Sequence, residues 1–261
     1  MVTGFGPCMS GTIEPIIALP SVEFFASGRG IHAIDSPVKM RILSMLKERE
    51  MSFDEIVLHL GKAKSTVSVH LKWLTSEGVI SSRSDTADSR RKIFSLDSVF
   101  IGEASPDERV RVQEQKDEIY QFGEDNPGNF FRFVLKTIRV TLLREGIIID
   151  PLLQAAGYRV GRSLYDYVKS ADIEEFLLKI SEFWTYHSLG LVRVITLSPV
   201  VINIYDCFEC IDLPPLGRPA CAFESGILNG LFSSFYNEKI ISTEIHCYAM
   251  GDNYCQFVIE Q

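Results

Sequence analysis

The sequence has no long apolar run and no export segment. A transmembrane helix needs roughly 18–20 consecutive apolar residues, whereas the apolar stretch 13–20 is interrupted by Glu14 and Pro15. The N-terminus has no basic segment ahead of a longer apolar core, so a signal peptide is not predicted. We therefore expect a cytoplasmic protein that has no membrane among its partners.

The sequence also lacks the short motifs of the common enzyme classes. It contains neither Gly-x-Gly-x-x-Gly nor a Walker Gly-Lys-Ser/Thr, and neither Gly-x-Ser-x-Gly nor His-Glu-x-x-His. The adjacent acids Glu174 and Glu175 lie on a predicted helix surface, where they would be solvated. These absences argue against an enzyme and predict no catalytic residue.

Cysteine is absent from residues 37–97, which form a basic region of an acidic chain. This region holds 11 Lys and Arg against 8 Asp and Glu, although the whole chain of 261 residues has a net charge of −8. A chain of this length usually holds about two domains. A mildly basic module in an acidic protein favours one face that binds phosphate.

The cysteine-free region is predicted to fold as a helix-turn-helix followed by a β-hairpin. Ser36-Pro37 is typical of a helix start, Ser52 with Glu55 predicts a capping box, and Gly61 ends the second helix. The expected helices span about 37–49, 52–61 and 64–77, and the expected strands span 79–83 and 92–96. This layout would present the third helix to a DNA major groove.

The third helix and the hairpin carry the residues that we expect to bind double-stranded DNA. Val67, Leu71 and Leu74 repeat at helical spacing and should face the core. The other faces offer hydroxyls that can bond phosphates or base edges, and cations that suit phosphates. The candidates are Lys64, Ser65, Thr66, Ser68, His70, Lys72, Arg83, Arg90, Arg91 and Lys92. The alternative is a solvated helix face in a protein-binding module.

The remaining chain is predicted to form an extension, a linker and a second domain. Residues 1–36 form the extension, with a short helix at 22–26, and residues 98–128 form a linker whose charged part could be a connector or dimer helix. Residues 129–261 are predicted to be an α+β domain, because helices precede antiparallel strands. Its expected helices span about 130–145, 150–168, 172–187 and 221–236, and its expected strands span 191–197, 200–206 and 243–259.

Five of the six cysteines fall within the last 55 residues. They are Cys207, Cys210, Cys221, Cys247 and Cys255, whereas Cys8 stands alone. In a cytoplasmic protein this grouping favours a metal site or redox-active thiols over structural disulfides. All five are therefore candidates for redox sensing and for metal binding.

Zinc is the one candidate cofactor. It takes four ligands in tetrahedral geometry, which any four of the five cysteines could supply, with His246 and His187 as additional imidazoles. The spacing departs from that of a zinc ribbon, because seven residues separate Cys247 from Cys255.

A redox switch would instead need thiols of lowered pKa with a partner nearby. Asp206 and Glu209 precede Cys207 and Cys210 and should raise the pKa of these two thiols, whereas Cys247 follows His246 and is better placed. A third reading leaves the cysteines mostly structural, since a buried cysteine behaves as a small apolar residue.

The predicted DNA-binding region resembles the winged helix of ArsR-type regulators. The resemblance is carried by Ser36-Pro-Val-Lys-Met-Arg-Ile-Leu43 and by Ser65-Thr-Val-Ser-Val-His-Leu-Lys-Trp-Leu74, which matches the family pattern Ser-x-x-Ser-x-His-Leu-x-x-Leu. It implies a homodimer on an inverted-repeat operator. The metal ligands of that family are often a Cys-x-Cys pair, so the lack of cysteine in 37–97 argues against a metal-sensing winged helix.

The second domain resembles the 4-vinyl-reductase domain. The resemblance covers about 129–261 and is carried by Gly157-Tyr-Arg-Val-Gly161, by the apolar strands ending in Cys207 and by the closing segment 244–257 with its Cys-x₇-Cys element. The two glycines also predict close packing of two helices. The domain is associated by resemblance with small hydrophobic ligands. Phe176, Phe183, Trp184, Tyr186 and Phe232 could line such a pocket or form ordinary core.

Together the two regions resemble the methanogen-specific vinyl-reductase-domain regulators, an archaeal family. The resemblance implies a homodimeric regulator, a repressor in the reading we favour, that controls its own gene and genes of oxidative-stress defence through thiol state. Oxidation or metal loss would rearrange the strands near 205–255, and the connector at 106–122 would change the spacing of the two reading helices. The rival readings are a sensor of an apolar ligand, and an accessory factor of tetrapyrrole or aromatic metabolism.

Overall fold

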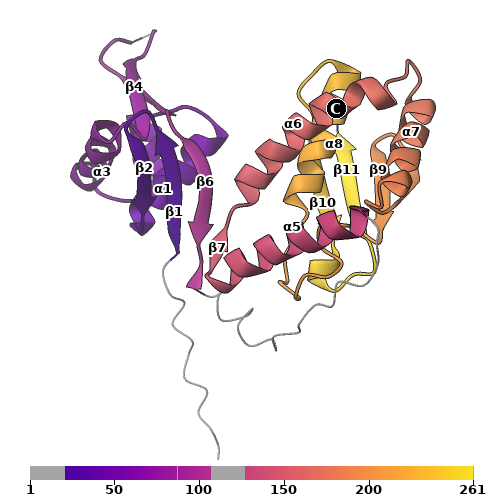
Figure 1. The fold of residues 1–261 in the computed structure, drawn as a ribbon. Coiled ribbons are helices and arrows are strands. Elements are labelled where there is room, and N and C mark those ends of the chain that lie inside the picture. Colours follow the sequence, from indigo (N-terminus) through magenta and orange to yellow (C-terminus); the bar gives the residue numbers. More distant parts are fainter. Residues whose placement is uncertain (1–20, 87, 107–126, 261) are drawn as a thin grey trace, which may run out of the picture.

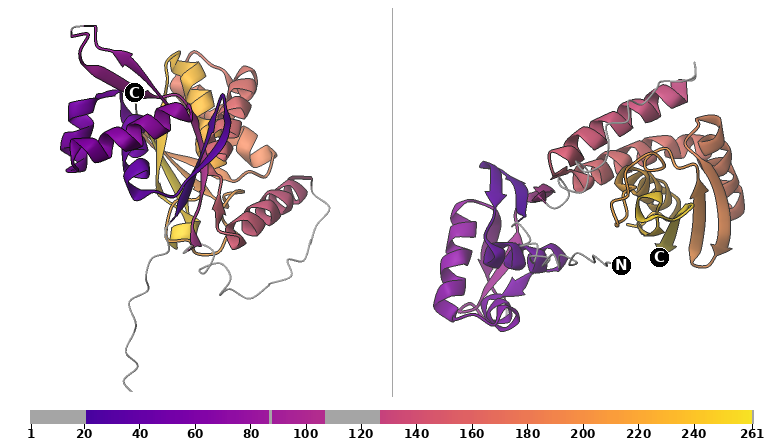
Figure 2. Two further views of the ribbon diagram at one scale, coloured as in Figure 1. Left: turned by 90° about the vertical axis from the view of Figure 1, so that its left-hand side faces the viewer. Right: turned by 90° about the horizontal axis from the view of Figure 1, so that it is seen from below.

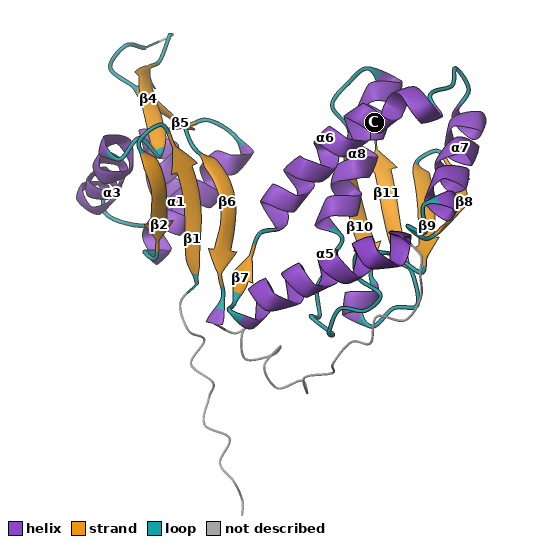
Figure 3. Cartoon of the chain, in the orientation of Figure 1, coloured by secondary structure: helices purple, strands orange, loops and turns teal. Residues whose placement is uncertain are grey.

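The computed structural model describes residues 21–86, 88–106 and 127–260, which form two domains (Figure 1). The N-terminal domain holds the helix-turn-helix, and the C-terminal domain combines helices with an antiparallel sheet (Figure 3). The α+β class predicted from the sequence is confirmed.

The winged helix forms as its sequence predicts. Its elements are α1 Pro37–Glu48, α2 Phe53–Leu60, α3 Lys64–Ser76, β3 Met51–Ser52, β4 Ile80–Ser84 and β5 Lys92–Leu96, with sheet order β3-β5-β4. Ser52 and Glu55 make both hydrogen bonds of the capping box. Gly61 ends α2 in the left-handed conformation, at φ 60°, which glycine adopts without steric cost.

The short helix predicted at 22–26 is wrong, because these residues form a strand. β1 Val22–Ser27 pairs with β2 Gly30–Ile34 on one side and with β6 Val99–Ala104 on the other. Its Phe25 is fully buried in the core of the winged helix. Pairing on both edges and burial of an aromatic side chain outweigh the local helix start, as is usual for strand residues.

One sheet joins the two domains. Its order is β2-β1-β6-β7, and β7 Ile147–Ile148 already belongs to the C-terminal part of the chain. Glu103 pairs with Ile148 and Ala104 with Ile147. The segment predicted as a linker therefore begins with a strand that ties the winged helix to the second domain (Figures 1 and 2). Most of its charged part, 107–122, lies outside the described residues.

The C-terminal domain packs four helices around a four-stranded sheet. The helices are α5 Pro127–Arg144, α6 Asp150–Val168, α7 Ile173–Tyr186 and α8 Ala222–Tyr236. The strands are β8 Leu191–Leu197, β9 Val200–Tyr205, β10 Ile241–His246 and β11 Cys255–Glu260, in the antiparallel order β10-β11-β9-β8. A short 3₁₀ helix, Tyr248–Met250, splits the strand expected at 243–259 into β10 and β11.

Glycines bring α6 and α8 into backbone contact, as their spacing predicts. A Cβ at Gly157 would overlap the carbonyl of Phe223, and one at Gly161 would overlap the carbonyl of Ile227. Gly226 and Gly230 of α8 face α6 in the same way. Helix α8 is thus held at the centre of the domain, with its first turn against the sheet. Within the described residues no helix is long and apolar enough to span a bilayer.

Candidate DNA-binding surface and thiol cluster

The exposed face of α3 carries the side chains predicted to contact DNA. Val67, Leu71 and Leu74 are buried, as predicted. All ten candidates lie on α3 or on the β4–β5 hairpin, and His70 alone among them is half-buried rather than exposed. The arrangement suits a helix that enters the major groove with its polar face towards the bases.

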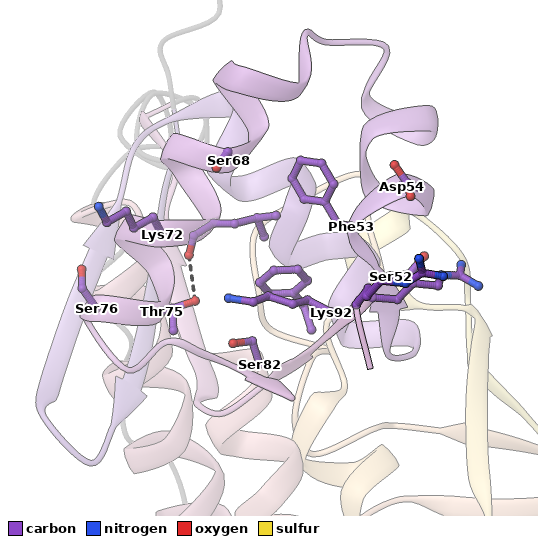
Figure 4. Close-up of a pocket in the computed structure, with 13 residues that line it drawn as sticks. Ser52, Phe53, Asp54, Ser68, Lys72, Thr75, Ser76, Ser82 and Lys92 are labelled. Carbon is purple, nitrogen blue, oxygen red and sulfur yellow. Dashed lines mark hydrogen bonds between the residues drawn. The ribbon is translucent and has the colours of Figure 1, made fainter. Parts of the chain in front are cut away.

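A groove separates α3 from the hairpin, with a volume of about 690 Å³. Ser68 and Lys72 of α3 line one side, and the hairpin residues Arg90, Arg91 and Lys92 line the other. Figure 4 shows Ser68, Lys72 and Lys92 around this space. Cations on two sides of one groove are arranged to hold a phosphodiester chain.

Three of the predicted cations have acidic partners in the protein. Lys64 Nζ lies 2.8 Å from Asp54 Oδ1, Arg83 Nη2 lies 2.6 Å from Glu50 Oε2, and Arg90 pairs with Asp88. These pairs are exposed, so each is worth little and phosphate can replace the carboxylate.

The β1–β2 hairpin supports the C-terminal end of α3, a role that the sequence did not predict. Arg29 donates a hydrogen bond to the Ser76 carbonyl and packs its side chain on Gly78. His32 Nδ1 lies 3.7 Å from a Glu77 carboxylate oxygen. The hairpin was missed because its first strand was predicted as a helix.

The five C-terminal cysteines meet in one buried thiol cluster. Cys207 follows β9, Cys210 lies in the next turn, Cys221 precedes α8, Cys247 follows β10 and Cys255 begins β11. The Sγ–Sγ distances are 3.2 Å for Cys210–Cys255, 3.5 Å for Cys207–Cys221, 3.6 Å for Cys221–Cys255, 3.8 Å for Cys221–Cys247 and 4.0 Å for Cys247–Cys255. The cluster combines four segments that are separate in the sequence.

These sulfur distances suit a metal site as well as reduced thiols. A disulfide requires about 2.05 Å, so all five cysteines are free. In a tetrahedral zinc–thiolate site with Zn–S of about 2.3 Å, neighbouring sulfurs lie about 3.8 Å apart. The measured range of 3.2–4.0 Å brackets that edge.

Two sets of four side chains bring their ligand atoms within 4.8 Å of one another. One set is Cys207, Cys210, Cys221 and Cys255, and the other is Cys221, Glu244, Cys247 and Cys255. His246 belongs to neither set; it is 41% exposed and its Nδ1 lies 3.3 Å from Asp252 Oδ2. His187 lies instead against Phe183, on α7. The sequence did not single out Glu244 as a ligand.

Two buried carboxylates face the thiols. Glu224 accepts hydrogen bonds from Trp184 Nε1 at 2.8 Å and from the Cys207 thiol at 3.0 Å. Glu244 Oε2 accepts the Cys221 backbone N–H at 3.0 Å, while its buried Oε1 has no hydrogen-bond partner among the described residues. Burial raises the pKa of Glu244 to about 9 and the pKa of Glu224 well above its ordinary value.

The acids next to the cysteines point away from the thiols. Asp206 pairs with Arg132, and Glu209 pairs with the buried Arg139 at 2.6 Å. Glu209 also accepts the backbone N–H groups of Phe223 and Glu224, the first turn of α8. Burial raises the pKa of Glu209 to about 7. The predicted influence of these two acids is therefore directed to arginines and to a helix end.

The thiols themselves differ in acidity. Hydrogen bonds from the Cys210 and Cys221 thiols lower the pKa of Cys247, which the sequence had attributed to His246. Burial raises the pKa of Cys221, the cysteine within 3.8 Å of three others. A cluster with one acidic and one resistant thiol has an obvious first site of attack.

An apolar cavity of about 670 Å³ lies beside the cluster, between α5, α6, α7 and α8. Phe183 and Tyr186 line it, as predicted for a ligand pocket. Phe176, Trp184 and Phe232 are fully buried core instead. Phe208, which follows Cys207, lines the cavity too.

Two family models match the chain. Residues 36–82 match the helix-turn-helix of the bacterial regulatory proteins of the arsR family, and residues 200–261 match the 4-vinyl-reductase domain. The uncharacterized protein MJ1642 of Methanocaldococcus jannaschii is 32% identical over 126 residues, which are 48% of this chain and 74% of that protein.

Two solved structures show more distant likeness. A vinyl-4-reductase family protein from Methanocaldococcus jannaschii matches 59% of this chain and 92% of its own, at 17% identity and a TM-score of 0.37. The adhesin competence repressor of Streptococcus pyogenes matches 23% of this chain and 46% of its own, at 21% identity and a TM-score of 0.23. The chain therefore belongs to the family of 4-vinyl-reductase-domain proteins, in a form that joins this domain to an arsR-family DNA-binding helix-turn-helix, the arrangement of a transcription regulator.

Proposed function

We propose that the chain is a redox-responsive transcriptional repressor that binds operator DNA as a homodimer while its cluster thiols are reduced. Its operators would include its own upstream region and genes of oxidative-stress defence. The observation that supports this proposal best is the gathering of five free cysteines in one buried cluster, in a chain whose other domain is a winged helix.

DNA binding rests on the groove beside α3. Lys72 on one side and Arg91 and Lys92 on the other would neutralise phosphates, while Ser65 and Ser68 lie on the part of α3 that can reach base edges. Two such surfaces in a dimer read two half-sites, so their spacing decides affinity.

The redox step would join two of the cluster thiols. A peroxide transfers one oxygen to a thiolate as its O–O bond breaks, which leaves a sulfenic acid and water or an alcohol. A second thiol attacks the sulfenic sulfur, an S–S bond forms and water leaves. The two cysteines thereby lose two electrons to the peroxide.

Disulfide formation would move the surrounding structure. The closest sulfurs are 3.2 Å apart in Cys210–Cys255 and 3.5 Å apart in Cys207–Cys221, so either bond requires an approach of about 1 Å or more. A close-packed core cannot absorb such a shift locally.

A chain of buried contacts would carry this shift to the winged helix. Glu209, next to Cys210, pairs with Arg139, which also donates to the Ala220 carbonyl and lies 3.2 Å from Asp150. Asp150 begins α6 directly after β7, and β7 pairs with β6 of the N-terminal sheet. This route uses described contacts, whereas most of the connector proposed from the sequence lies outside them.

The test compares DNA binding by reduced and peroxide-treated protein on a fragment from upstream of its own gene. We expect affinity to fall on oxidation and to return with a thiol reductant. Cys210→Ser should weaken the response, and Cys8→Ser, which alters a cysteine outside the cluster, should keep it. Equal affinity before and after oxidation would reject the redox function.

The apolar cavity supports a second candidate, a sensor of a small hydrophobic ligand. Phe208 and Phe223 line the cavity and lie one and two residues from Cys207 and Cys221, so a bound ligand would press on the same loops. Leu164→Trp would fill part of the cavity. Under this reading that substitution alters DNA binding, while a thiol-blocking reagent leaves DNA binding unchanged.

A further inference from the structure

The thiol cluster holds more ligands than one tetrahedral ion can use. A zinc ion takes four, whereas the two sets together contain five cysteines and Glu244. A single ion bound by either set would leave two buried side chains of the other set without a partner. Buried ionisable groups are usually paired or bound to metal.

The two sets share one edge. Cys221 and Cys255 belong to both, and their sulfurs lie 3.6 Å apart. On one side of this edge lie Cys207, 3.5 Å from Cys221, and Cys210, 3.2 Å from Cys255. On the other side lies Cys247, 3.8 Å from Cys221 and 4.0 Å from Cys255. All these distances fit edges of two tetrahedra joined along Cys221–Cys255.

Glu244 supplies an independent observation for the second tetrahedron. Its carboxylate oxygen lies within 4.8 Å of the ligand atoms of Cys221, Cys247 and Cys255. One of its oxygens is held by the Cys221 backbone N–H, and the other is buried without a hydrogen-bond partner among the described residues. A buried unpartnered oxygen is costly, and a metal ion would remove that cost.

We propose that the cluster is a binuclear site for thiophilic divalent ions such as Zn²⁺, in which the Cys221 and Cys255 sulfurs bridge two ions. Cys207 and Cys210 complete the first ion, and Glu244 and Cys247 complete the second. With Zn–S bonds of about 2.3 Å and the observed shared edge, the ions would lie about 3 Å apart. Thiolate ligands select zinc over the harder ions magnesium and calcium.

Metal content measures this directly. The full chain, purified under reducing conditions and loaded with Zn²⁺ alone, is analysed by native mass spectrometry and elemental analysis. We expect two zinc ions per chain and no thiol of the cluster open to a blocking reagent. One ion per chain with two reactive cluster thiols would overturn the binuclear site.

Paired variants assign the two ions. Cys207→Ser with Cys210→Ser should lose one ion and keep the second, and Glu244→Gln with Cys247→Ser should lose the other. Cys8→Ser should keep both. A wild-type protein loaded with ¹¹³Cd²⁺ should show two cadmium resonances that are coupled through the shared sulfurs, and this readout needs no variant to fold. A single resonance would contradict the proposal.

The outcome is separable from that of the redox function, because the site concerns ion number and the function concerns DNA affinity. Two ions with oxidation-insensitive DNA binding would uphold the binuclear site and reject the redox switch. One ion with oxidation-sensitive DNA binding would do the reverse.

Discussion

The DNA-binding surface and the thiol cluster are built in opposite ways. The first uses exposed side chains from a continuous stretch, α3 to β5, that contains no cysteine. The second uses buried side chains from four segments that only the sheet order β10-β11-β9 and helix α8 bring together. The comparison teaches that a surface for a charged polymer can be laid out locally, whereas a protected reactive centre depends on the whole domain.

The two regions also differ in how they tolerate substitution. Exposed cations near the groove are held by weak surface pairs. The cluster rests on buried groups such as Arg139, which is 3% exposed and touches both a cluster loop and the start of α6. Variants of each kind can therefore break the comparison or sharpen it.

The largest effect is expected for Arg139→Met. The substitution leaves Glu209, which is fully buried, without its cation, and breaking a buried pair in this way costs about 3–5 kcal/mol. We expect a loss of that size in the free energy of unfolding of the C-terminal domain, measured by urea denaturation.

Arg132→Met is the matched control on the same helix. Arg132 pairs with Asp206, whose side chain is 56% exposed, so the loss should stay near 1 kcal/mol or below. Equal destabilisation by the two substitutions would mean that the buried network around Arg139 has no special role.

The next effect concerns DNA. Lys72→Ala with Lys92→Ala removes one cation from each side of the groove and should weaken DNA binding about 100-fold while reducing its salt dependence. Fluorescence anisotropy over a range of salt concentrations measures both. Lys179→Ala, which removes an exposed cation from α7, should change neither quantity; if it weakened binding equally, net charge rather than the groove would explain the result.

The smallest effect is expected at the start of α2. Ser52→Ala removes the cap of this helix and should cost about 1 kcal/mol at pH 7. Hydrogen bonds from Ser52 lower the pKa of Glu55 from 4.5 to about 2. The stability that this carboxylate contributes is present above pH 4.5 and is lost as the pH falls towards 2.

The difference between wild type and Ser52→Ala should therefore shrink between pH 4.5 and pH 2 in urea denaturation. Ser163→Ala, on the exposed face of α6, provides the comparison and should show no such trend. A cap contribution that stayed constant down to pH 2 would contradict the role of Glu55.

Local patterns were sufficient for much of the fold. The capping box at Ser52, the stop at Gly61 and the apolar stripe Val67, Leu71 and Leu74 predicted the winged helix, and Gly157 with Gly161 predicted the contact with a second helix. Each of these patterns acts within a few residues or on a single helix face.

Long-range pairing set what the sequence could not predict. Val22–Ser27 is a strand because β2 and β6 pair with it, and nothing in its own short segment encodes a partner near residue 100. Cys221 is central to the cluster, although its neighbours in the chain suggest ordinary core. Glu244 became a candidate ligand only when the β10 edge placed it beside Cys247.

The central claim is that the thiol cluster and the DNA groove are coupled, and coupling must act in both directions. A redox titration of the cluster thiols with and without operator DNA tests this. If the reduced form binds DNA more tightly, DNA must make the thiols harder to oxidise, and the midpoint potential should rise by about 30 mV for each tenfold difference in affinity. An unchanged midpoint at saturating DNA would show that the two regions act independently and would contradict the account.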